Sequence, residues 1–261
     1  MRYLGAQILD VEAAVNALLS DAADGVVLGD ALCQRRMFRH GEPGLVQAAV
    51  ELSSIGGRAL LQTPLYATDA TCRETLDLAA LLASLGMLDA TIVQDVGLAA
   101  LLRERLPEIP LVWGRWGRVR GGSVNADTLC FLREIGVSAV ECEVPERTGA
   151  IHGLGLSVYG AVGRLSYATL SRLCYSCHLA NTDEAACERR CVMIREELLT
   201  GGCSLEVHGR IVGERLDYPA TENDFVQKDD PAEHVIVYAS TIEGAAELCH
   251  RATGSRPKED S

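Results

Sequence analysis

Residues 58–105, RALLQTPLYATDATCRETLDLAALLASLGMLDATIVQDVGLAALLRER, decide the fold class because they contain two successive strand-and-helix units. The short apolar run Arg58–Gln62 is typical of a buried strand. Cys72–Leu85 has apolar side chains at spacings of three and four, as one face of a helix does. Thr91–Gln94 and Gly97–Arg105 repeat the strand and the helix, so this stretch predicts a β-α-β-α unit.

The same alternation extends to both sides of this stretch. Further strands are expected at Arg2–Ile8, Gly25–Leu28, Leu111–Trp113, Ala139–Glu143 and Leu154–Tyr159, and further helices at Val11–Ser20, Gly44–Ile55 and Asn125–Ile135. Parallel neighbours need a crossover, so about seven such strands predict an α/β fold, a (β/α) TIM-like barrel that is closed or incomplete. A doubly wound open sheet is the alternative, although no Gly-x-Gly-x-x-Gly follows the first strand.

The length and composition favour one integrated domain. At 261 residues with 48% apolar residues, the chain can fill a single large core. We expect a barrel core at 1–160, a cysteine-rich segment packed on it at 161–225, and a C-terminal helix with a frayed tail at 226–261. The net charge of −12 makes nucleic acid an unlikely partner. Neither a secretory leader nor a membrane span is visible, so we expect a cytoplasmic protein with reduced thiols.

The cysteine spacing indicates a soft metal site. Cys187 and Cys191 are four residues apart, so on a helix both thiols would lie on one face. Cys174 precedes them, and Cys33 in the N-terminal part best supplies a fourth thiolate, which would complete the ligands of a [4Fe–4S] cluster. Cys177 is a rival ligand, because its two-residue spacing from Cys174 also suits zinc or an iron–sulfur site.

Polar residues just beyond the predicted strands form a second pattern. In a barrel these positions meet at one face, where ligands bind. They are Asp30, Gln62, Asp95, Arg115 and Glu143, with Cys33 close behind Asp30.

Several segments resemble the peptidase U32 family, in particular its UbiV-type iron–sulfur branch. The segments are Val27-Leu-Gly-Asp-Ala-Leu-Cys33-Gln-Arg-Arg36, Val93-Gln-Asp-Val-Gly97, Asn125–Gly136, the spacing of Cys174, Cys187 and Cys191, and Val207-His-Gly209, which resembles a strand and turn after the cluster. The resemblance covers residues 1 to 215. The segment from Gly160 to Cys174 is longer than in the family, which leaves open whether Cys174 or Cys177 is the ligand.

The resemblance implies a [4Fe–4S] cluster on Cys33, Cys174, Cys187 and Cys191. It further implies a heterodimer with a paralogous U32 subunit (UbiU-like) that performs oxygen-independent hydroxylation in ubiquinone biosynthesis. The substrate is then an aromatic small molecule, with prephenate as a candidate oxygen donor. Candidate substrate-binding residues are Asp95, Arg115, His152, Tyr159 and Arg172, and the arginines would suit a carboxylate.

Three other functions stay open at this point. The family name implies a peptidase, other members hydroxylate RNA bases, and this chain could be a cluster-bearing partner without an active site of its own. The sequence contains neither the His-Glu-x-x-His motif of a zinc peptidase nor the Gly-x-Ser-x-Gly nucleophile elbow, so no motif supports the peptidase function. The acidic composition counts against RNA.

Overall fold

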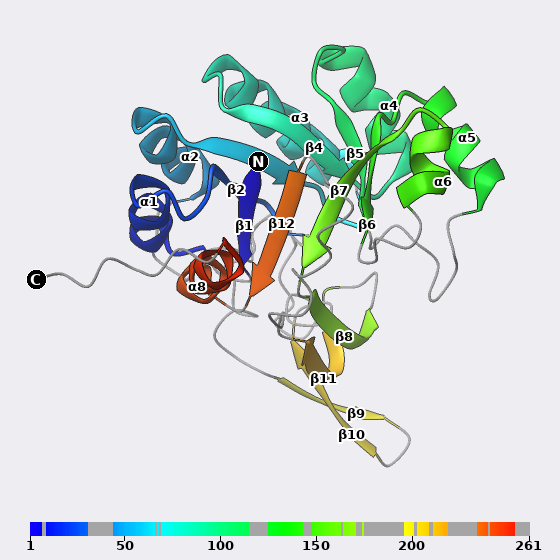
Figure 1. The fold of residues 1–261 in the computed structure, drawn as a ribbon. Helices are drawn as coiled ribbons and strands as arrows, with labels where there is room; N and C mark the ends of the chain where they lie inside the picture. Colours follow the sequence, from blue (N-terminus) through cyan, green and yellow to red (C-terminus); the bar gives the residue numbers. More distant parts are fainter. Residues whose placement is uncertain are drawn as a thin grey trace, which may run out of the picture.

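The computed structural model describes residues 1–6, 9–30, 44–65, 67, 69–114, 125–142, 148–162, 164–170, 174, 196–200, 203–208, 211–218, 234–239 and 241–253. Their main feature is a closed barrel of eight strands surrounded by helices (Figure 1).

The barrel strands are parallel, and their order around the barrel is β1-β12-β7-β6-β5-β4-β3-β2. The strands are β1 (Arg2–Ala6), β2 (Gly25–Leu28), β3 (Arg58–Gln62), β4 (Leu88–Val93), β5 (Leu111–Trp113), β6 (Ala139–Cys142), β7 (Ser157–Val162) and β12 (His234–Ala239). The predicted TIM-like barrel is confirmed, and the doubly wound open sheet is wrong.

The closing strand lies outside the predicted 1–160 segment. β12 pairs with β1 from Arg2↔Val235 to Ala6↔Ala239, and on its other side with β7. Without β12, the backbone N–H and C=O groups along one edge of β1 and one edge of β7 would have no partner strand. The barrel therefore comprises more of the chain than predicted. The seventh strand also starts later than predicted, at Ser157, because Gly155 with φ +74° belongs to the turn after α6.

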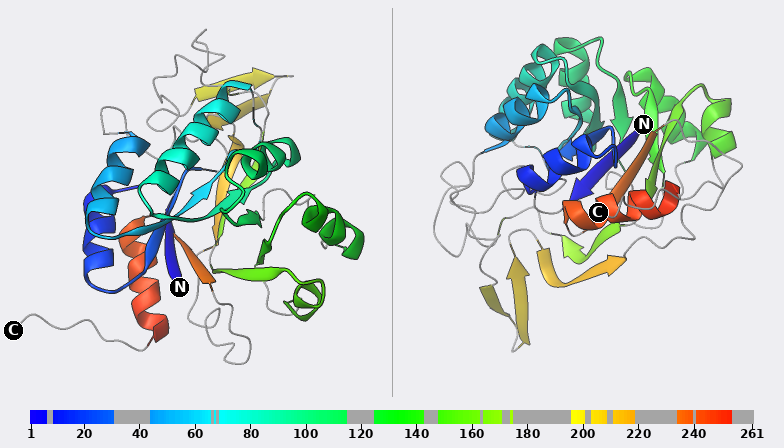
Figure 2. Two further views of the ribbon diagram at one scale, coloured as in Figure 1. Left: turned by 90° about the horizontal axis from the view of Figure 1, so that it is seen from above. Right: turned by 60° about the vertical axis from the view of Figure 1, so that its left-hand side comes forward.

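The helices form the outer layer, as Figure 2 shows from two further sides. They are α1 (Val11–Leu19), α2 (Leu45–Ser54), α3 (Asp69–Ser84), α4 (Val96–Arg105), α5 (Ala126–Glu134), α6 (Thr148–Gly153) and α8 (Ile242–Thr253). α1 and α5 begin at side-chain caps, where Asp10 accepts from the amide of Ala13 and Asn125 from that of Thr128. None of the helices in the described residues is long and apolar enough to cross a bilayer.

Strand side chains alternate between two apolar layers. One layer fills the barrel interior and includes Val27, Leu60 and Ile92, while the other packs beneath the helices and includes Leu28 and Leu61. The period of two along each strand produces this division. It also tells which side chains at the strand ends face inward.

A second, smaller sheet lies at the C-terminal end of the barrel. It contains β8 (Arg164–Leu170), β9 (Glu196–Thr200), β10 (Cys203–His208) and β11 (Ile211–Tyr218) in the order β8-β11-β10-β9, with antiparallel pairing. In Figure 1 the arrowheads of β7 and β12 point towards this sheet. The segment predicted to be cysteine-rich thus contributes an antiparallel sheet beside one end of the barrel.

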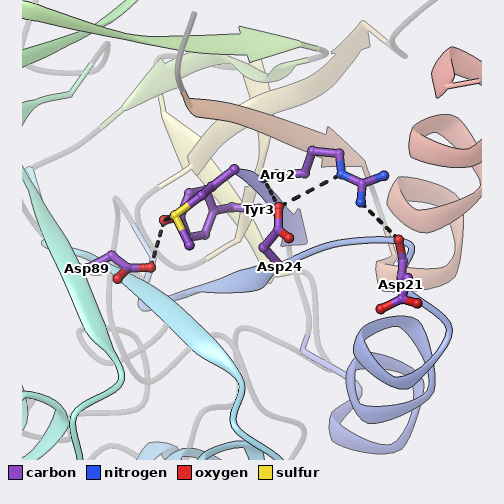
Figure 3. A network of polar contacts seen from close by, with 6 residues as sticks. Arg2, Tyr3, Asp21, Asp24 and Asp89 are labelled. Carbon is purple, nitrogen blue, oxygen red and sulfur yellow. Dashed lines mark hydrogen bonds and ion pairs between the residues drawn. The ribbon is translucent and has the colours of Figure 1, made fainter.

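Polar contacts occupy the opposite, N-terminal end of the barrel (Figure 3). Asp89 accepts a hydrogen bond from the Tyr3 hydroxyl at 2.7 Å and pairs with Arg58. A β-bulge makes this possible: Ala59 pairs with Leu88 and Leu60 with Ala90, so Asp89 is the extra residue of β4. Burial, followed by the contact with Asp89, raises the pKa of Tyr3 well above its ordinary value.

A further pair at this end ties β1 to the turn before β2. The backbone amide of Arg2 donates to the Asp24 carboxylate at 2.7 Å, and its guanidinium donates to the carbonyl of Asp21 at 3.0 Å (Figure 3). These contacts connect β1 to β3, to β4 and to the turn before β2. These polar contacts therefore stabilise the N-terminal end of the barrel.

Candidate functional site

The candidate site is the mouth at the C-terminal end of the barrel. The inward-facing residues of the strands are apolar inside the barrel and become small or polar at this end. Continuing the inward alternation of the strands leads to glycine or alanine on four of them, namely Gly5, Gly29, Gly114 and Ala161. The other four strands carry the polar side chains of Gln62, Gln94, Glu141 and Tyr238. Below them lies the apolar interior layer, so the mouth combines an apolar floor with polar groups above it.

Gln62 is the last residue of β3 and has a side chain that is 6% exposed. The neighbouring Gly29 has φ +92°, and a Cβ built on it would lie 2.1 Å from the carbonyl oxygen of Gln62. Only glycine can combine this conformation with this approach. Gly29 therefore determines how closely the end of β2 approaches Gln62.

Gln94 follows the end of β4 and is 4% exposed. Its Nε2 donates to the backbone carbonyl of Thr63 at 3.2 Å, which connects the ends of β3 and β4. A Cβ on Gly114 would lie 2.8 Å from Ile92 Cγ2 and 3.1 Å from Gln94 Cγ. The missing side chain of Gly114 thus gives the Gln94 side chain its place.

Two amide atoms in the mouth have no hydrogen-bond partner in the described part of the chain: Nε2 of Gln62 and Oε1 of Gln94. Buried polar atoms in native proteins nearly always have partners. Since both side chains are inward-facing and buried, these atoms are free to bind a ligand or water.

Two further polar side chains complete the mouth. Glu141 in β6 is fully buried, and its inward neighbour along the strand is Ala139 of the interior layer. The Tyr238 ring of β12 covers Gly5, where an added Cβ would lie 2.6 Å from Cδ1 of the ring. The mouth therefore also contains one carboxyl group and one phenol ring.

Asp95, a predicted substrate-binding residue, serves to begin a helix. It is the N-cap of α4, and its carboxylate accepts from the backbone amide of Leu98 at 2.9 Å. Burial raises the pKa of the nearby Cys72 thiol, and the charges of Asp95 and Asp69 raise it further. The structure therefore gives Asp95 a local structural role at the C-terminal end of β4.

His152 and Tyr159 do not lie together at the mouth. His152 is exposed near the end of α6, the helix that returns the chain to the start of β7. Tyr159 lies in the barrel interior and stacks on His234, with ring centroids 4.4 Å apart and an angle of 11° between the planes. The other two predicted substrate-binding residues, Arg115 and Arg172, lie outside the described residues.

Of the predicted cluster ligands, the structure describes Cys174. This cysteine is half-buried, forms no disulfide and follows the end of β8. Cys33, Cys187, Cys191 and the rival Cys177 lie outside the described residues. Within the described ranges no three metal-binding side chains come together. The cluster stays a prediction.

Sequence reasoning found part of the mouth. It expected Asp30 and Gln62 at the strand ends, and both are buried there. Gln94 was assigned to a strand end but not to a site. Glu141 could have been found from the sequence, because it is a charged residue in an otherwise apolar strand. It also lies two residues after Ala139, which faces the barrel interior. Tyr238 belongs to a strand that was not predicted.

Comparisons with known proteins agree with this fold. Residues 11–142, just over half of the chain, match the model described as peptidase family U32. None of the curated proteins matches the chain. The solved structure of the U32 peptidase Mk0906 is 15% identical, with 92% of each chain covered and a TM-score of 0.53. At this identity the similarity shows the fold.

Two other solved structures are similar at lower scores. Tryptophan synthase from M. tuberculosis is 15% identical over 98% of this chain and 91% of its own, with a TM-score of 0.47. A 3-keto-L-gulonate-6-phosphate decarboxylase from Vibrio cholerae is 10% identical over 98% and 99%, with a TM-score of 0.45.

Proposed function

The chain belongs to peptidase family U32, and from this premise we propose that it is the iron–sulfur subunit of an oxygen-independent hydroxylase. Its substrate would be a ubiquinone-type precursor, and its partner a paralogous U32 subunit with which it forms a heterodimer. Prephenate is the proposed oxygen donor. The barrel mouth would receive the aromatic ring.

The observation that carries this proposal is the position of Cys174. It follows β8, which continues from β7 at the C-terminal end of the barrel. Cys33 comes five residues after the end of β2, where the chain leaves the barrel at that same end. Cys33 and Cys174, which are 141 residues apart in the sequence, thus follow strands that end at the same end of the barrel.

The donor set fits an iron–sulfur cluster. Thiolates are its usual ligands, and Cys174 is a half-buried thiol that is not used in a disulfide. Cys33, Cys174, Cys187 and Cys191 would hold the cluster, with Cys177 as the rival for the position of Cys174. A [4Fe–4S] cluster supplies electron transfer or, with one iron open, Lewis-acid chemistry. The protein residues at the mouth would orient the ring and exclude water from it.

The first test is anaerobic purification followed by visible and electron paramagnetic resonance spectroscopy, with iron and sulfide analysis. We expect a coloured protein with about four irons and four sulfides per chain. Colourless protein with stoichiometric zinc would contradict the proposal. Cys33→Ala should abolish the cluster while Cys177→Ala leaves it intact, and the reverse result would make Cys177 the ligand.

Peptidase activity is the competing function, because the matching family and the solved relative both have that name. A nucleophilic cysteine needs a lowered pKa. Burial instead raises the pKa of Cys72, and it raises the pKa of Cys249 to about 11. Turnover of peptides by the isolated chain would favour the peptidase, whereas co-purification with a paralogous subunit would favour the hydroxylase.

A further inference from the structure

We propose that Gln62 and Gln94 form a donor–acceptor pair that binds the hydroxyl group of an uncharged aromatic ring in the barrel mouth. The inference rests on the proposed function for the identity of the reaction, and it adds the residues that select the substrate. Neither glutamine belongs to the cysteine set.

The first argument is the unmet hydrogen bonding of the two amides. Gln62 and Gln94 are more than nine-tenths buried, yet Gln62 Nε2 and Gln94 Oε1 have no partner in the described part of the chain. Desolvating such atoms without a partner destabilises the fold. The ends of the neighbouring strands β3 and β4 thus each carry one unpartnered amide atom, which can bind a ligand group.

The second argument is the fixed direction of the pair. Gln94 Nε2 donates to the carbonyl of Thr63, so its Oε1 is left as an acceptor. Thr63 is the next residue after Gln62, so one short backbone segment positions both amides. Gln62 Nε2 can only donate. A hydroxyl group is the smallest ligand group that accepts from one atom and donates to the other.

The third argument concerns the charge and shape of the ligand. The eight inward positions of the mouth include no lysine or arginine, and they include the buried carboxyl group of Glu141. These positions therefore offer no cation to pair with a carboxylate ligand. Leu60, Ile92 and Ile236 of the interior layer lie below the polar groups. An apolar ring with one hydroxyl group matches this combination.

The test measures the affinity of phenol for the full chain, purified anaerobically, by ligand-observed NMR titration. Toluene, which lacks the hydroxyl group, and benzoate, which carries a charge, serve as comparison probes. We expect phenol to bind at least about tenfold more tightly than either. Phenol that binds no better than toluene would overturn the proposal and assign the two amides to water.

Variants then test the pair itself. Gln62→Met and Gln94→Met keep the side-chain length and remove the amide, so each should weaken phenol binding about tenfold and leave toluene binding unchanged. Thr91→Val is the matched control, because Thr91 is a buried β4 residue outside the inward-facing set. It should bind phenol like the wild type. Wild-type affinity in both glutamine variants would overturn the proposal.

Two controls distinguish a loss of phenol binding at the glutamine pair from a loss of folding or of the cluster. Gln94→Met removes the contact with Thr63, so circular dichroism must show that the variant is folded; if it is not, Gln62→Met alone decides. Cys187→Ser, which should lose the cluster, is expected to bind phenol like the wild type. Absence of iron from the wild type would contradict the proposed function alone, and absence of phenol binding in iron-loaded protein would contradict the glutamine pair alone.

Discussion

Gly29 is the residue on which the geometry of the mouth depends most directly. Its φ of +92° disfavours any side chain, and a Cβ added to it would lie only 2.1 Å from the carbonyl oxygen of Gln62. Gly56 has a similar φ of +75°, but nothing lies within 4 Å of its Cβ position. The two glycines therefore separate the cost of backbone conformation from the cost of a clash.

We expect Gly56→Ala to lower the free energy of unfolding by about 1 kcal/mol, which is the cost of a left-handed alanine. Gly29→Ala should cost about 3 kcal/mol or more, because the carbonyl of Gln62 must also move. Urea unfolding of both variants at one pH measures the difference. Equal losses would show that the approach of β2 to Gln62 adjusts freely.

Single residues also show where prediction from sequence ends. Gln62 was expected at the mouth because a polar residue ends an apolar run. The role of its neighbour was not visible, because the requirement for glycine at position 29 depends on a backbone 33 residues further along the chain. The same holds for Gly114, whose missing side chain makes room for Gln94. Contacts between strands determine these positions, and one sequence does not display such contacts.

At the scale of helices and strands, the start of α4 shows a structural role for Asp95, which the sequence predicted to bind substrate. Asp95 caps α4 by accepting from the amide of Leu98. Asn caps helices about as well as Asp does, and Ala does not. Asp95→Ala should therefore lower the free energy of unfolding by about 1 kcal/mol, and Asp95→Asn by much less.

Both Asp95 variants should keep the phenol affinity of the wild type. Urea unfolding and NMR titration of the same samples check the two expectations. A loss of phenol binding in stable, folded Asp95→Asn protein would show that the carboxylate contacts the ligand, as the sequence predicted. Asn125→Ala, which removes the corresponding cap of α5, is the control for a purely structural loss.

The predicted elements agree with the structure where a strand and its helix follow each other directly. From β1 to β7 the alternation of apolar runs with helical periodicity identified every strand. The antiparallel sheet was indicated only at the end of β10, by Val207-His208. A hairpin signal was present in Gly201-Gly202, between β9 and β10. The cysteine spacing in this segment predicted ligands, and such spacing contains no information on strands.

The closure of the barrel depends on the longest-range pairing in the chain. β12 fits between β1, at the start of the sequence, and β7, more than 70 residues earlier than β12. Its side chains Ile236 and Val237 are fully buried, one in each apolar layer. The sequence contains the apolar run of β12, but nothing local indicates that this run completes a sheet begun at Arg2.

Removal of residues 226–261 should therefore prevent cooperative folding. The deletion exposes the edges of β1 and β7 and removes the fully buried Ile242 and Ala245 of α8, so both apolar layers open to water. A shorter deletion, of residues 254–261, leaves β12 and α8 complete and should unfold in urea with the midpoint of the full chain. Limited proteolysis and urea unfolding of the two truncated chains compare these cases. If the longer deletion still gave a cooperative transition and a protease-resistant core, the first seven strands would form a stable sheet by themselves. In that case β12 would cover an existing fold, and closure would contribute little to the positions of Gln62 and Gln94.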